Sequence, residues 1–304
     1  MQKMKYLLAV SGGPDSMALL DLATRKHQVY AVVHVNYHWR KTANRDLHIV
    51  QQYFHLHHLK LFIKTINPLI YQQNKIKNFE AWARQVRYNF FNLIANITNH
   101  HHILMAHHLD DYLETAIMQL TSHRSLFHYG IVKNNEIKHL IINRPFLKKY
   151  WKIDLVNYCQ KHHLSYGIDE TNNDPQYFRN YVRLILNKQT KNKNHLLQLI
   201  EQLNGLLASQ YRKSLLYYWE WRKTNNIANL LKLSFNYQLN LLKIFLYSHH
   251  INNLSQNKLE GIIGFLHSNL NQKAFRVATN TYLRKINKSI FLIKDSVKSN
   301  KINK

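Results

Sequence analysis

The sequence predicts an α/β protein in which a doubly wound, mostly parallel sheet is followed by a smaller, mainly helical domain. Two observations lead to this prediction. Short apolar or β-branched segments alternate with amphipathic segments as far as residue 190, and such alternation is typical of parallel strands joined by crossover helices. Beyond that point the pattern changes to helices. We therefore expect one domain over residues 1–190 and a second over residues 191–304.

The first domain is expected to contain strands that are each followed by a helix. A buried strand at Lys5–Val10 leads into two adjacent glycines and a helix at Ser16–Lys26, where the apolar residues follow a helical period. The elements expected after these are, in chain order, a strand at Val29–Val35, a helix at Thr42–His58, a strand at Leu59–Ile66, a helix at Asn78–Asn96, a strand at Ile103–Ala106 and a helix that begins at Asp110.

The second domain is expected to be built from helices, with one strand near its end. No internal repeat is found, and the Lys- and Asn-rich tail after Lys294 is expected to fray. The expected helices are Leu196–Ser209, Tyr211–Arg222, Tyr237–Ser248 and Leu259–His267, and the expected strand is Ser289–Ile293.

The charge of the chain points to a polyanionic partner. Among 304 residues, 42 are Lys or Arg and 16 are Asp or Glu, a formal charge of +26, and charge of this size adheres to nucleic acid or anionic membrane. No apolar run reaches the ~18 residues of a membrane span, and the apolar run Tyr6–Val10 is too short for a secretory signal. We therefore expect a soluble cytoplasmic protein that contacts nucleic acid.

The distribution of the charge says more than its total. Lys, Asn, Ile, Tyr and His are abundant beside only 7 Gly and 4 Pro, which suggests an AT-rich coding sequence and hence some lysines without a functional reason. Residues 1–190 hold 24 basic and 12 acidic residues, whereas residues 191–304 hold 18 basic and 4 acidic. Sites that handle metals and amines need carboxylates, and surfaces that grip phosphates do not. This contrast predicts a catalytic first domain and a basic second domain that contacts the polyanion.

One loop has the residues needed to hold a polyphosphate. Ser11, Gly12, Gly13, Pro14, Asp15 and Ser16 lie between the first strand and the first helix. The glycines let the backbone approach phosphate groups, and amides at a helix start point toward an anion. Asp15 can hold Mg²⁺ beside them. The alternative is a plain strand–turn–helix in which Asp or Ser caps the helix. The loop is no Walker A motif, because GxxxxGK[ST] is absent.

This SGGxDS loop resembles the PP-loop of the N-type ATP pyrophosphatases, which have a Rossmann-like fold and cleave ATP to AMP and pyrophosphate. The resemblance implies that residues 11–16 bind the phosphates of ATP and that the second strand near Val33 and His34 lies by the adenine. It further implies a reaction that passes through an adenylate.

Further stretches resemble the tRNA(Ile)-lysidine synthetases within that group. His34, Val35, Asn36 and Arg40 match the ends of the family's HVNHGLR signature, although residues 37–39 read Tyr-His-Trp. That departure leaves no family role for Tyr37. Taken alone, His34 fits a hydrogen-bonded histidine at a strand end better than a functional residue.

A second stretch resembles the family's E-x-x-A-R-x-x-R-Y segment. Glu80, Arg84 and Arg87 have helical spacing and share one face of the expected helix. Unaided, this face predicts a surface ladder of ion pairs. The resemblance implies instead that it faces the reaction site and contacts tRNA.

A third stretch matches the family's HHxDDxxET pattern. It contains His107, Asp110, Asp111 and Glu114, the three acids lying within five residues of a chain poor in acids. Clustered carboxylates can hold Mg²⁺ on ATP or bind the ammonium group of an amino acid. The alternative is that they compensate the dipole at a helix start, and the histidines could instead bind a metal.

The remaining matches lie between residues 122 and 183. Arg144–Leu147, Asp169–Asn172 and the Arg179–Arg183 segment resemble the family's RPLL, D-x-[ST]-N and RN-x-x-R stretches. Arg179 and Arg183 stand at i, i+4, as phosphate or anticodon contacts would, or as a solvated helix face would. The family's RGSG loop reads Ser122–Ser125 here, and without glycine we expect a different loop geometry.

The resemblance covers residues 5–190 and weakens beyond them, where it rests on helix pattern and a segment that begins at Ala274. It implies that ATP, Mg²⁺ and lysine are used to form lysidine at the wobble cytidine of an isoleucine tRNA with a CAU anticodon. Asp15 would hold the metal, and the acids of the third stretch would bind lysine. The tRNA contacts would be Arg40, Arg84, Arg87, Arg179 and Arg183. An extra C-terminal RNA-binding module is expected to be absent, and the oligomeric state stays open, a homodimer included.

Three alternatives remain. A tRNA thiolase of the same group fits the charge, but its usual chemistry needs paired or catalytic cysteines, and Cys159 is the only cysteine of the chain. A single cysteine also excludes a disulfide framework and a cysteine zinc site. An NAD or GMP synthetase fits the loop but not the charge of +26. A non-catalytic basic RNA-binding protein would tolerate the loss of Asp15.

Overall fold

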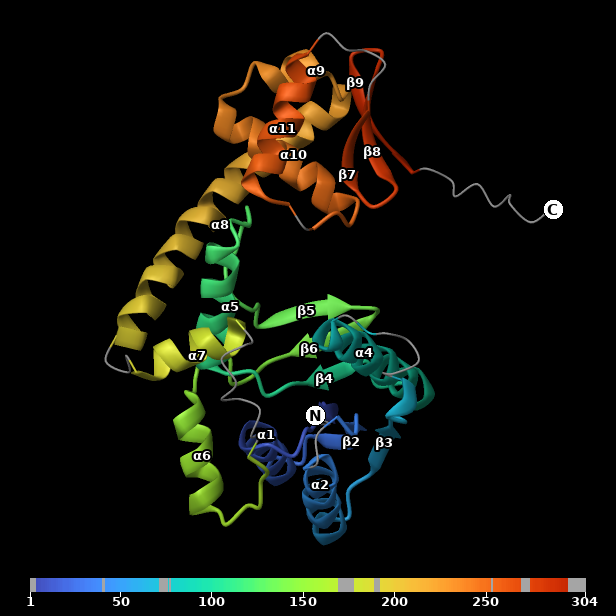
Figure 1. The fold of residues 1–304 in the computed structure, drawn as a ribbon, viewed down its shortest axis with the longest axis vertical. Helices are drawn as coiled ribbons and strands as arrows, with labels where there is room; N and C mark the ends of the chain where they lie inside the picture. Colours follow the sequence, from blue (N-terminus) through green and yellow to red (C-terminus); the bar gives the residue numbers. More distant parts are fainter. Residues whose placement is uncertain are drawn as a thin grey trace, which may run out of the picture. The chain divides into compact units, whose positions relative to one another are not determined.

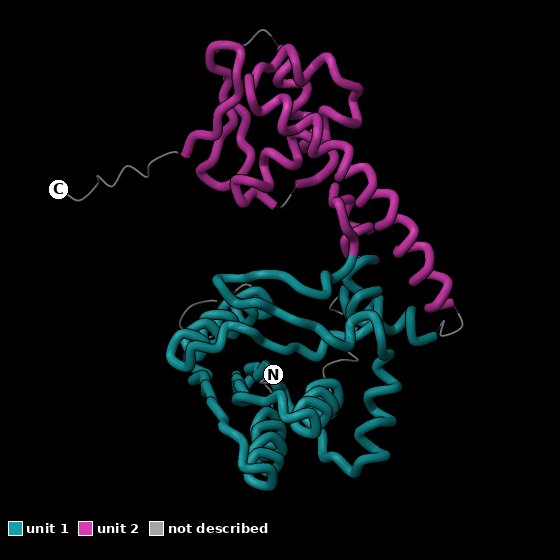
Figure 2. Tube along the Cα trace, turned by 180° about the vertical axis from the view of Figure 1, so that it is seen from behind, with its two compact units in different colours: residues 1–116, 130–190 teal, residues 117–129, 191–304 magenta. Residues whose placement is uncertain are grey.

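The computed structural model describes residues 4–39, 42–70, 76, 78–168, 178–188, 192–252, 254–268 and 274–294. Two compact units share the chain (Figure 2): unit 1 holds residues 1–116 and 130–190, and unit 2 holds residues 117–129 and 191–304. The sequence assigns residues 117–129 to the first domain. In the structure they belong to unit 2, because Phe127 packs on its core and Tyr129 exchanges two hydrogen bonds with Asn204.

Unit 1 is organised by a six-stranded sheet of order β3-β2-β1-β4-β6-β5 (Figure 1). Every neighbouring pair is parallel except β5 and β6, which form an antiparallel hairpin. The predicted mostly parallel sheet is thus confirmed. The strands are β1 (Tyr6–Ala9), β2 (Val29–Asn36), β3 (Leu61–Thr65), β4 (His102–Leu104), β5 (Asn134–Ile137) and β6 (Leu140–Asn143).

Helices cover both faces of this sheet, as a doubly wound fold requires. Successive strand residues point to opposite faces, so Leu8 and Val32 meet α1, α2 and α6, while Leu7 and Ala31 meet α4. The helices of unit 1 begin with α1 (Pro14–Arg25), α2 (Ala43–His57) and α4 (Phe79–Thr98), and continue with α5 (Leu109–Thr121), α6 (Lys152–Lys161) and α7 (Phe178–Lys188). The end of α5 belongs to unit 2.

The topology gathers several connections at one edge of the sheet. Because β1, β2, β4 and β6 run parallel, the segments that follow them leave from the same edge. Ligands of open α/β sheets bind at this carboxyl edge. The predicted phosphate loop, residues 37–39, the start of α5 and the segment after β6 all begin there.

Unit 2 combines helices with a three-stranded antiparallel sheet of order β7-β8-β9. A single core joins the two parts and contains Trp221, Leu242, Ile262 and Leu283. The elements are α8 (Lys193–Thr224), α9 (Ile227–Leu231), α10 (Phe235–Ser248), α11 (Gln256–His267), β7 (Ala274–Ala278), β8 (Thr281–Ile286) and β9 (Ser289–Lys294).

Two predictions for unit 2 were wrong. The helices expected at Leu196–Ser209 and Tyr211–Arg222 form one helix, α8, because no helix breaker separates them. Of the three strands only β9 was expected. The hairpin between β8 and β9 turns on Asn287 and Lys288, both at positive φ, and so lacks the glycine that usually signals such a turn.

Left-handed backbone positions in this chain are filled by histidine and asparagine more than by glycine. Among the described residues, Gly12 and Gly130 are the glycines with positive φ. The non-glycine residues with positive φ are His27, His38, His58, Asn99, His123, Lys138, His139, His163, Asn225, His250, Asn280, Asn287 and Lys288. Histidine and asparagine tolerate this region better than most residues. His123 takes a left-handed φ in the segment Ser122–Ser125, where the family has RGSG, so a histidine here holds a backbone angle that glycine adopts more readily.

No helix in the described parts of the chain is both long enough and apolar enough to cross a membrane.

Candidate functional site

The loop between β1 and α1 is shaped by the hydroxyl of Ser16. Its Oγ accepts hydrogen bonds from the N–H groups of Ser11 (3.1 Å) and Gly12 (3.2 Å), and it donates to the carbonyl of Gly13 (3.0 Å). No side chain caps the first turn of α1. The amides at that turn carry the positive end of the helix dipole, which favours an anion.

The two glycines of this loop serve different purposes. Gly12 has φ +92°, and a Cβ there would lie 2.8 Å from the carbonyl oxygen of Asp46, so the fold itself requires glycine. Gly13 has an ordinary φ of −78°, and a Cβ there would meet nothing closer than 3.7 Å. Glycine at position 13 therefore keeps open a space that the described protein atoms do not fill, as a loop approached by phosphate needs.

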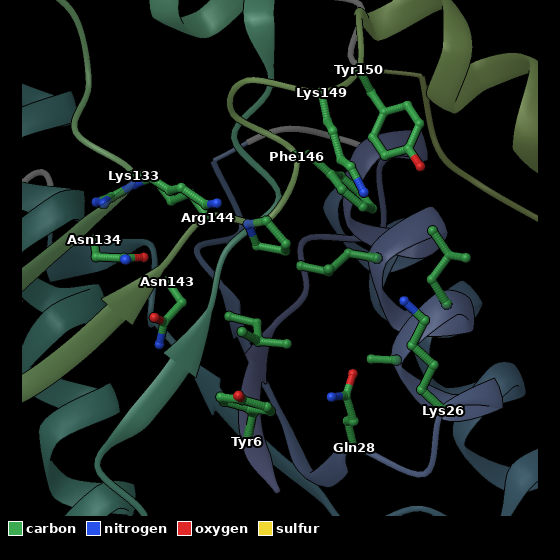
Figure 3. Close-up of a pocket in the computed structure, with 15 residues that line it drawn as sticks. Tyr6, Lys26, Gln28, Lys133, Asn134, Asn143, Arg144, Phe146, Lys149 and Tyr150 are labelled. Atoms are coloured by element: carbon green, nitrogen blue, oxygen red, sulfur yellow. The ribbon is translucent and has the colours of Figure 1, made fainter. Parts of the chain in front are cut away.

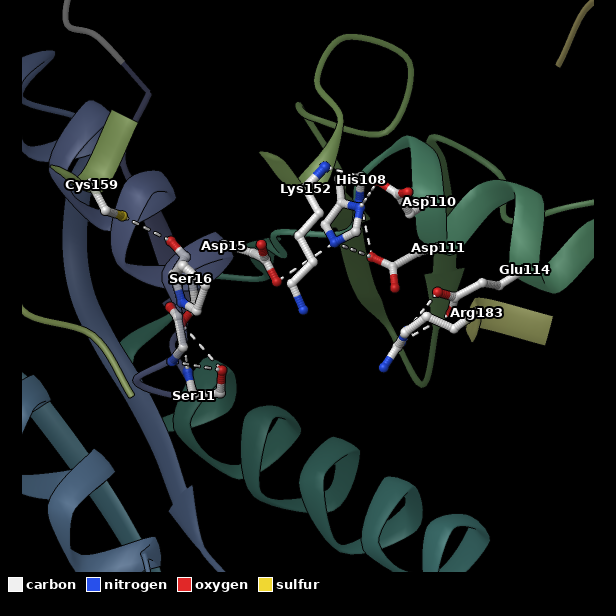
Figure 4. A network of polar contacts seen from close by, with 12 residues as sticks. Ser11, Asp15, Ser16, His108, Asp110, Asp111, Glu114, Lys152, Cys159 and Arg183 are labelled. Atoms are coloured by element: carbon white, nitrogen blue, oxygen red, sulfur yellow. Dashed lines mark hydrogen bonds and ion pairs between the residues drawn. The ribbon is translucent and has the colours of Figure 1, made fainter. Parts of the chain in front are cut away.

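His108 joins the phosphate loop to the acids of α5 (Figure 4). Its Nε2 lies 3.5 Å from Oδ2 of Asp15 and 3.4 Å from Oδ2 of Asp111, and its Nδ1 lies 3.4 Å from Oδ2 of Asp110. The backbone N–H of His108 also donates to Asp111 Oδ2 at 3.0 Å, so Asp111 caps its own helix as one sequence alternative expected. Three carboxylates from two elements are thus assembled around one buried ring.

Electrostatics keep this ring charged. Burial alone would lower the pKa of His108, but the carboxylates of Asp111, Asp110 and Asp15 outweigh it and raise that pKa to about 10. Burial would likewise raise the pKa of Asp111, yet His108 and His107 bring it below its usual range. At neutral pH the centre is therefore an imidazolium among carboxylates.

The other two acids of α5 have partners of their own. Asp110 Oδ2 accepts the backbone N–H of Lys152 at 2.8 Å, which ties α5 to the start of α6. Glu114 is almost fully buried and binds Arg183 of α7 through both oxygens, at 2.7 and 3.0 Å. Arg179 lies 4.0 Å from Glu114 and donates weakly to Thr115. Both arginines of the RN-x-x-R segment thus face α5.

His107 points to a different partner. Arg144, which follows β6 and is buried, donates from Nε to His107 Nδ1 at 3.2 Å. Burial, with help from the charge of Arg144, lowers the pKa of His107 to about 4. His107 is therefore neutral at pH 7. Arg87 acts on His107 and Arg84 acts on Arg144 electrostatically, so both arginines of α4 lie within electrostatic reach of these two residues.

His34 lies deep on β2. Its Nδ1 hydrogen-bonds the carbonyl of Val10 at 2.8 Å, while the buried Nε2 has no hydrogen-bond partner among the described residues. Burial lowers the pKa of His34, so Nδ1 carries the proton and Nε2 is an acceptor.

The described residues of this site fit a magnesium ion that a nucleotide helps to hold. Oδ1 of Asp15 is buried and has no hydrogen-bond partner in the described parts of the chain. Carboxylate oxygen is a preferred ligand of Mg²⁺. The described residues contain no group of three or more side chains placed to hold a metal by themselves. Mg²⁺ bound by one carboxylate and phosphate oxygens agrees with both observations.

A separate cavity of about 380 Å³ lies beside α1 and the segment that follows β6 (Figure 3). Of the site residues whose contacts are described above, Arg144 is the one that lines it. The phosphate loop and the acids of α5 do not. We therefore place the candidate site at the sheet edge and not in this cavity.

The sequence-predicted residues of the loop and of α5 thus lie together. Arg40 and the segment Asp169–Asn172 lie outside the described residues. Sequence reasoning missed His108 as a site residue and left Arg144 without a role. The doubled histidine of the HHxDDxxET match was the available signal for His108.

The fold and the loop define the class of this protein. A family model described as a PP-loop domain matches residues 1–190. Among solved structures, a U34-tRNA thiolase from Methanococcus maripaludis has a TM-score of 0.52 over 67% of this chain and 74% of its own. It is 16% identical, so this likeness concerns the fold alone.

Curated relatives narrow the class. The tRNA(Ile)-lysidine synthase of Mycoplasmopsis pulmonis is 37% identical over 95% of this chain and 99% of its own. Those of Malacoplasma penetrans (36%; 95% and 98%) and Mycoplasma pneumoniae (34%; 93% and 96%) are similar over the same extent. The chain belongs to the tRNA(Ile)-lysidine synthase family.

Proposed function

We propose that this protein is an ATP-dependent ligase that attaches lysine to C2 of the wobble cytidine in the CAU anticodon of an isoleucine tRNA. The main support for this proposal is the set of close contacts that connects Asp15 through His108 to Asp111. This link places a phosphate loop next to a carboxylate centre. A reaction that first activates cytidine with ATP and then binds an amine needs both groups in one site.

In the first step, the C2 oxygen of cytidine attacks the α-phosphorus of ATP, and the bond to pyrophosphate breaks. The chain contributes position and charge here more than covalent chemistry. The loop from Ser11 to Ser16 would hold the phosphates, with the space at Gly13 admitting them. The adenine would lie near His34, whose buried acceptor Nε2 suits a donor group. Asp15 would hold Mg²⁺, which neutralises phosphate charge when bound.

In the second step, the lysine ε-amine bonds to C2, and AMP leaves with the former C2 oxygen. We propose that Asp111 receives the ammonium group and takes its proton. Both oxygens of Glu114 are bound by Arg183, and Asp110 is bound by Lys152, so both are assigned positioning tasks. The contacts of Asp111 with His108 use Oδ2, and its Oδ1 would receive the ammonium group. Neutral His107 would help orient the site from the side of Arg144.

The tRNA would contact basic side chains of both predicted domains, residues 1–190 and 191–304. Arg84 and Arg87 on α4, with Arg179 and Arg183 on α7, would lie near the anticodon, together with Arg40. The acid-poor second domain would bind the tRNA body through phosphates. This substrate implies a cytoplasmic reaction, and sedimentation of the active enzyme would distinguish a monomer from a homodimer.

The decisive experiment incubates the protein with ATP, labelled lysine and a transcript of an isoleucine tRNA with a CAU anticodon. We expect label to enter the RNA and AMP to appear, and a transcript with uridine for the wobble cytidine should remain unlabelled. Folded protein that makes AMP but transfers no lysine would refute the proposal.

The loop can be tested by adding a single methyl group. Gly13→Ala should leave the fold intact, because nothing crowds a Cβ there, but should weaken ATP binding by about tenfold or more if phosphate occupies the space. The matched control is Gly205→Ala on α8, where a Cβ also meets nothing within 4 Å. Equal ATP affinity in the two variants would contradict the proposed loop contact.

The chemistry of Cys159 does not favour a thiolase. It is buried, and its Sγ donates to the carbonyl of Pro14 at 3.3 Å. Burial and the nearby carboxylates of Asp15 and Asp21 raise the pKa of this thiol to about 12. Such a thiol is not a nucleophile at neutral pH.

A further inference from the structure

Four aromatic side chains gather where β2 ends, and we name Tyr37, Trp39, Phe79 and Trp82 the aromatic platform. Trp39 and Phe79 stack with ring centroids 4.2 Å apart and planes 17° apart. Tyr37 meets the edges of Phe79 (6.0 Å) and Trp82 (6.2 Å). The platform lies in unit 1 and joins two elements, the turn after β2 and the first turn of α4.

The backbone after β2 is shaped to present these rings. Asn36 is buried, and its Oδ1 accepts the N–H of His38 at 2.9 Å. His38 has φ +49°, at the position where the family signature reads glycine. The turn is held against α4 by Tyr37, whose hydroxyl donates to the carbonyl of Ala83 at 2.8 Å. Tyr37 and Trp39 are thereby directed at Phe79 and Trp82, which share one face of α4.

Core packing does not account for the platform. Half of the surface of Trp39 is exposed, although tryptophan offers more apolar area for burial than other side chains. The next turn of α4 carries Arg84 and Arg87. Arg87 acts electrostatically on both Tyr37 and His107, so it is near the platform and near His107.

We propose that the aromatic platform stacks an unpaired base of the RNA substrate, next to the nucleotide that reacts. This inference rests on the proposed function. Proteins recognise single-stranded RNA by stacking splayed bases on aromatic rings flanked by arginine, and exposed Trp39 with Arg84 and Arg87 offers that combination. Tyr37 to Trp39 stand where the family signature reads His-Gly-Leu, so the proposed contact is inferred from the residues of this chain and not from that signature.

The test uses a hairpin RNA with the anticodon stem and loop of an isoleucine tRNA bearing CAU. Trp39→Ala should weaken its binding by roughly 5- to 100-fold, the range for one stacked base, and Trp39→Phe should restore most of it. The matched control is Trp219→Ala, which removes another exposed tryptophan, on α8 of unit 2. Thermal unfolding of each variant checks the fold.

An abasic scan identifies the stacked nucleotide. Each loop nucleotide is made abasic in turn. At one position the abasic hairpin should bind the wild type only as well as the intact hairpin binds Trp39→Ala. The affinity of Trp39→Ala should not fall further with that same abasic hairpin. Wild-type hairpin affinity in Trp39→Ala would overturn the proposal. So would a loss of ATP affinity without a loss of RNA affinity, which would mean that the rings stack adenine.

The outcome can be separated from that of the proposed reaction. If Trp39→Ala weakens hairpin binding while the wild type makes no lysidine, the platform stands and the reaction fails. If the wild type makes lysidine and Trp39→Ala binds and reacts equally well with limiting hairpin, the reaction stands and the platform fails.

Discussion

Unit 1 buries carboxylates and surrounds them with donors, whereas unit 2 buries lysines beside rings and carbonyl groups. Glu114 binds Arg183 through both oxygens, and buried Asp21 accepts hydrogen bonds from Arg25, Tyr53 and Tyr158. In unit 2, Lys243 lies 4.1 Å from the ring centroid of Phe127. No carboxylate among the described residues pairs with it.

The difference follows from composition and matters for function. Unit 1 keeps its acids where they can be paired and fixed, and a fixed carboxylate can hold a metal or an amine in one place. Residues 191–304 contain only 4 acids, so a buried lysine there finds neutral partners only. Paired charges should therefore support unit 1, whereas charge on a buried lysine should weaken unit 2.

The largest effect is expected from breaking the buried pair of unit 1. Glu114→Ala leaves Arg183 without its carboxylate and should lower the free energy of unfolding by about 3–5 kcal/mol. Urea unfolding measures this. The matched control is Glu220→Ala, which breaks the exposed pair of Glu220 with Lys223 in unit 2 and should change it by less than about 0.5 kcal/mol. Equal losses in the two variants would contradict the comparison.

Asp21→Asn keeps the shape of the side chain and removes its charge. Hydrogen bonds from three donors stabilise the fold more when they go to a charged carboxylate than when they go to an amide. We therefore expect the free energy of unfolding to fall by about 2 kcal/mol at pH 7. Burial favours the neutral acid, but hydrogen bonds from Arg25, Tyr158 and Tyr53 lower the pKa of Asp21 below its model-compound value of 3.8. The stability it adds is present above pH 3.8 and is lost as the pH falls through the lower, folded-state pKa.

Unfolding as a function of pH checks this prediction. The variant should lose less stability than the wild type on acidification. Glu136→Gln, at an exposed side chain, serves as the control and should follow the wild type. An unchanged acid response in Asp21→Asn would show that this carboxylate is not stabilised by its partners.

Lys243→Met should raise the free energy of unfolding, whereas the two substitutions in unit 1 should lower it. Burial lowers the pKa of Lys243 from 10.5 to about 8, so between these values the unfolded chain binds more protons and stability rises with pH. At pH 7 the substitution removes a penalty of about 2 kcal/mol, since each pKa unit is worth about 1.4 kcal/mol and the contact with Phe127 offsets part of it.

The slope of stability against pH between 8 and 10.5 should also flatten in Lys243→Met. Lys223→Met, at an exposed lysine of the same unit, is the control and should keep the slope. If Lys243→Met lowered the free energy of unfolding at pH 7, the contacts of the buried ammonium would have to outweigh the cost of its burial, which contradicts this prediction.

The smallest effect is expected at Lys285. Its Nζ donates to the carbonyl of Ser268 at the end of α11 and lies 4.8 Å from the ring centroid of Phe265. Lys285→Met loses this capping bond but also relieves burial, which lowers the pKa of Lys285. We expect a net loss of about 1 kcal/mol in thermal unfolding, compared with no change in exposed Arg284→Met. If Lys285→Met stabilised the protein as much as Lys243→Met, the hydrogen bond of Lys285 to Ser268 would contribute no stability, which contradicts this prediction.

Sequence patterns predicted the elements of unit 1 because apolar periodicity reports which side chains face a core. The strand expected at Lys5–Val10 is β1, and the helix expected at Asn78–Asn96 is α4. The hairpin of β5 and β6 escaped prediction because Lys138 and His139, both at positive φ, form its turn. A turn without glycine or asparagine carries no recognisable signal.

The candidate site was predictable to the level of motifs. Asp15 and Asp111 stood out because each lies in a short pattern of fixed spacing. The partners of the acids did not, since Arg183 meets Glu114 across 69 residues of chain and His108 reaches Asp15 from another strand end.

The sequence by itself determined the parallel sheet, the phosphate loop and the family, because each depends on local order of residues along the chain. Only the tertiary structure decided which carboxylate is engaged, which histidine is charged and which tryptophan is exposed. Those properties depend on burial and on charges brought close from distant segments. The choice between Asp110, Asp111 and Glu114 was open in the sequence. In the structure each has different partners, and the proposed roles of the three acids are based on that difference.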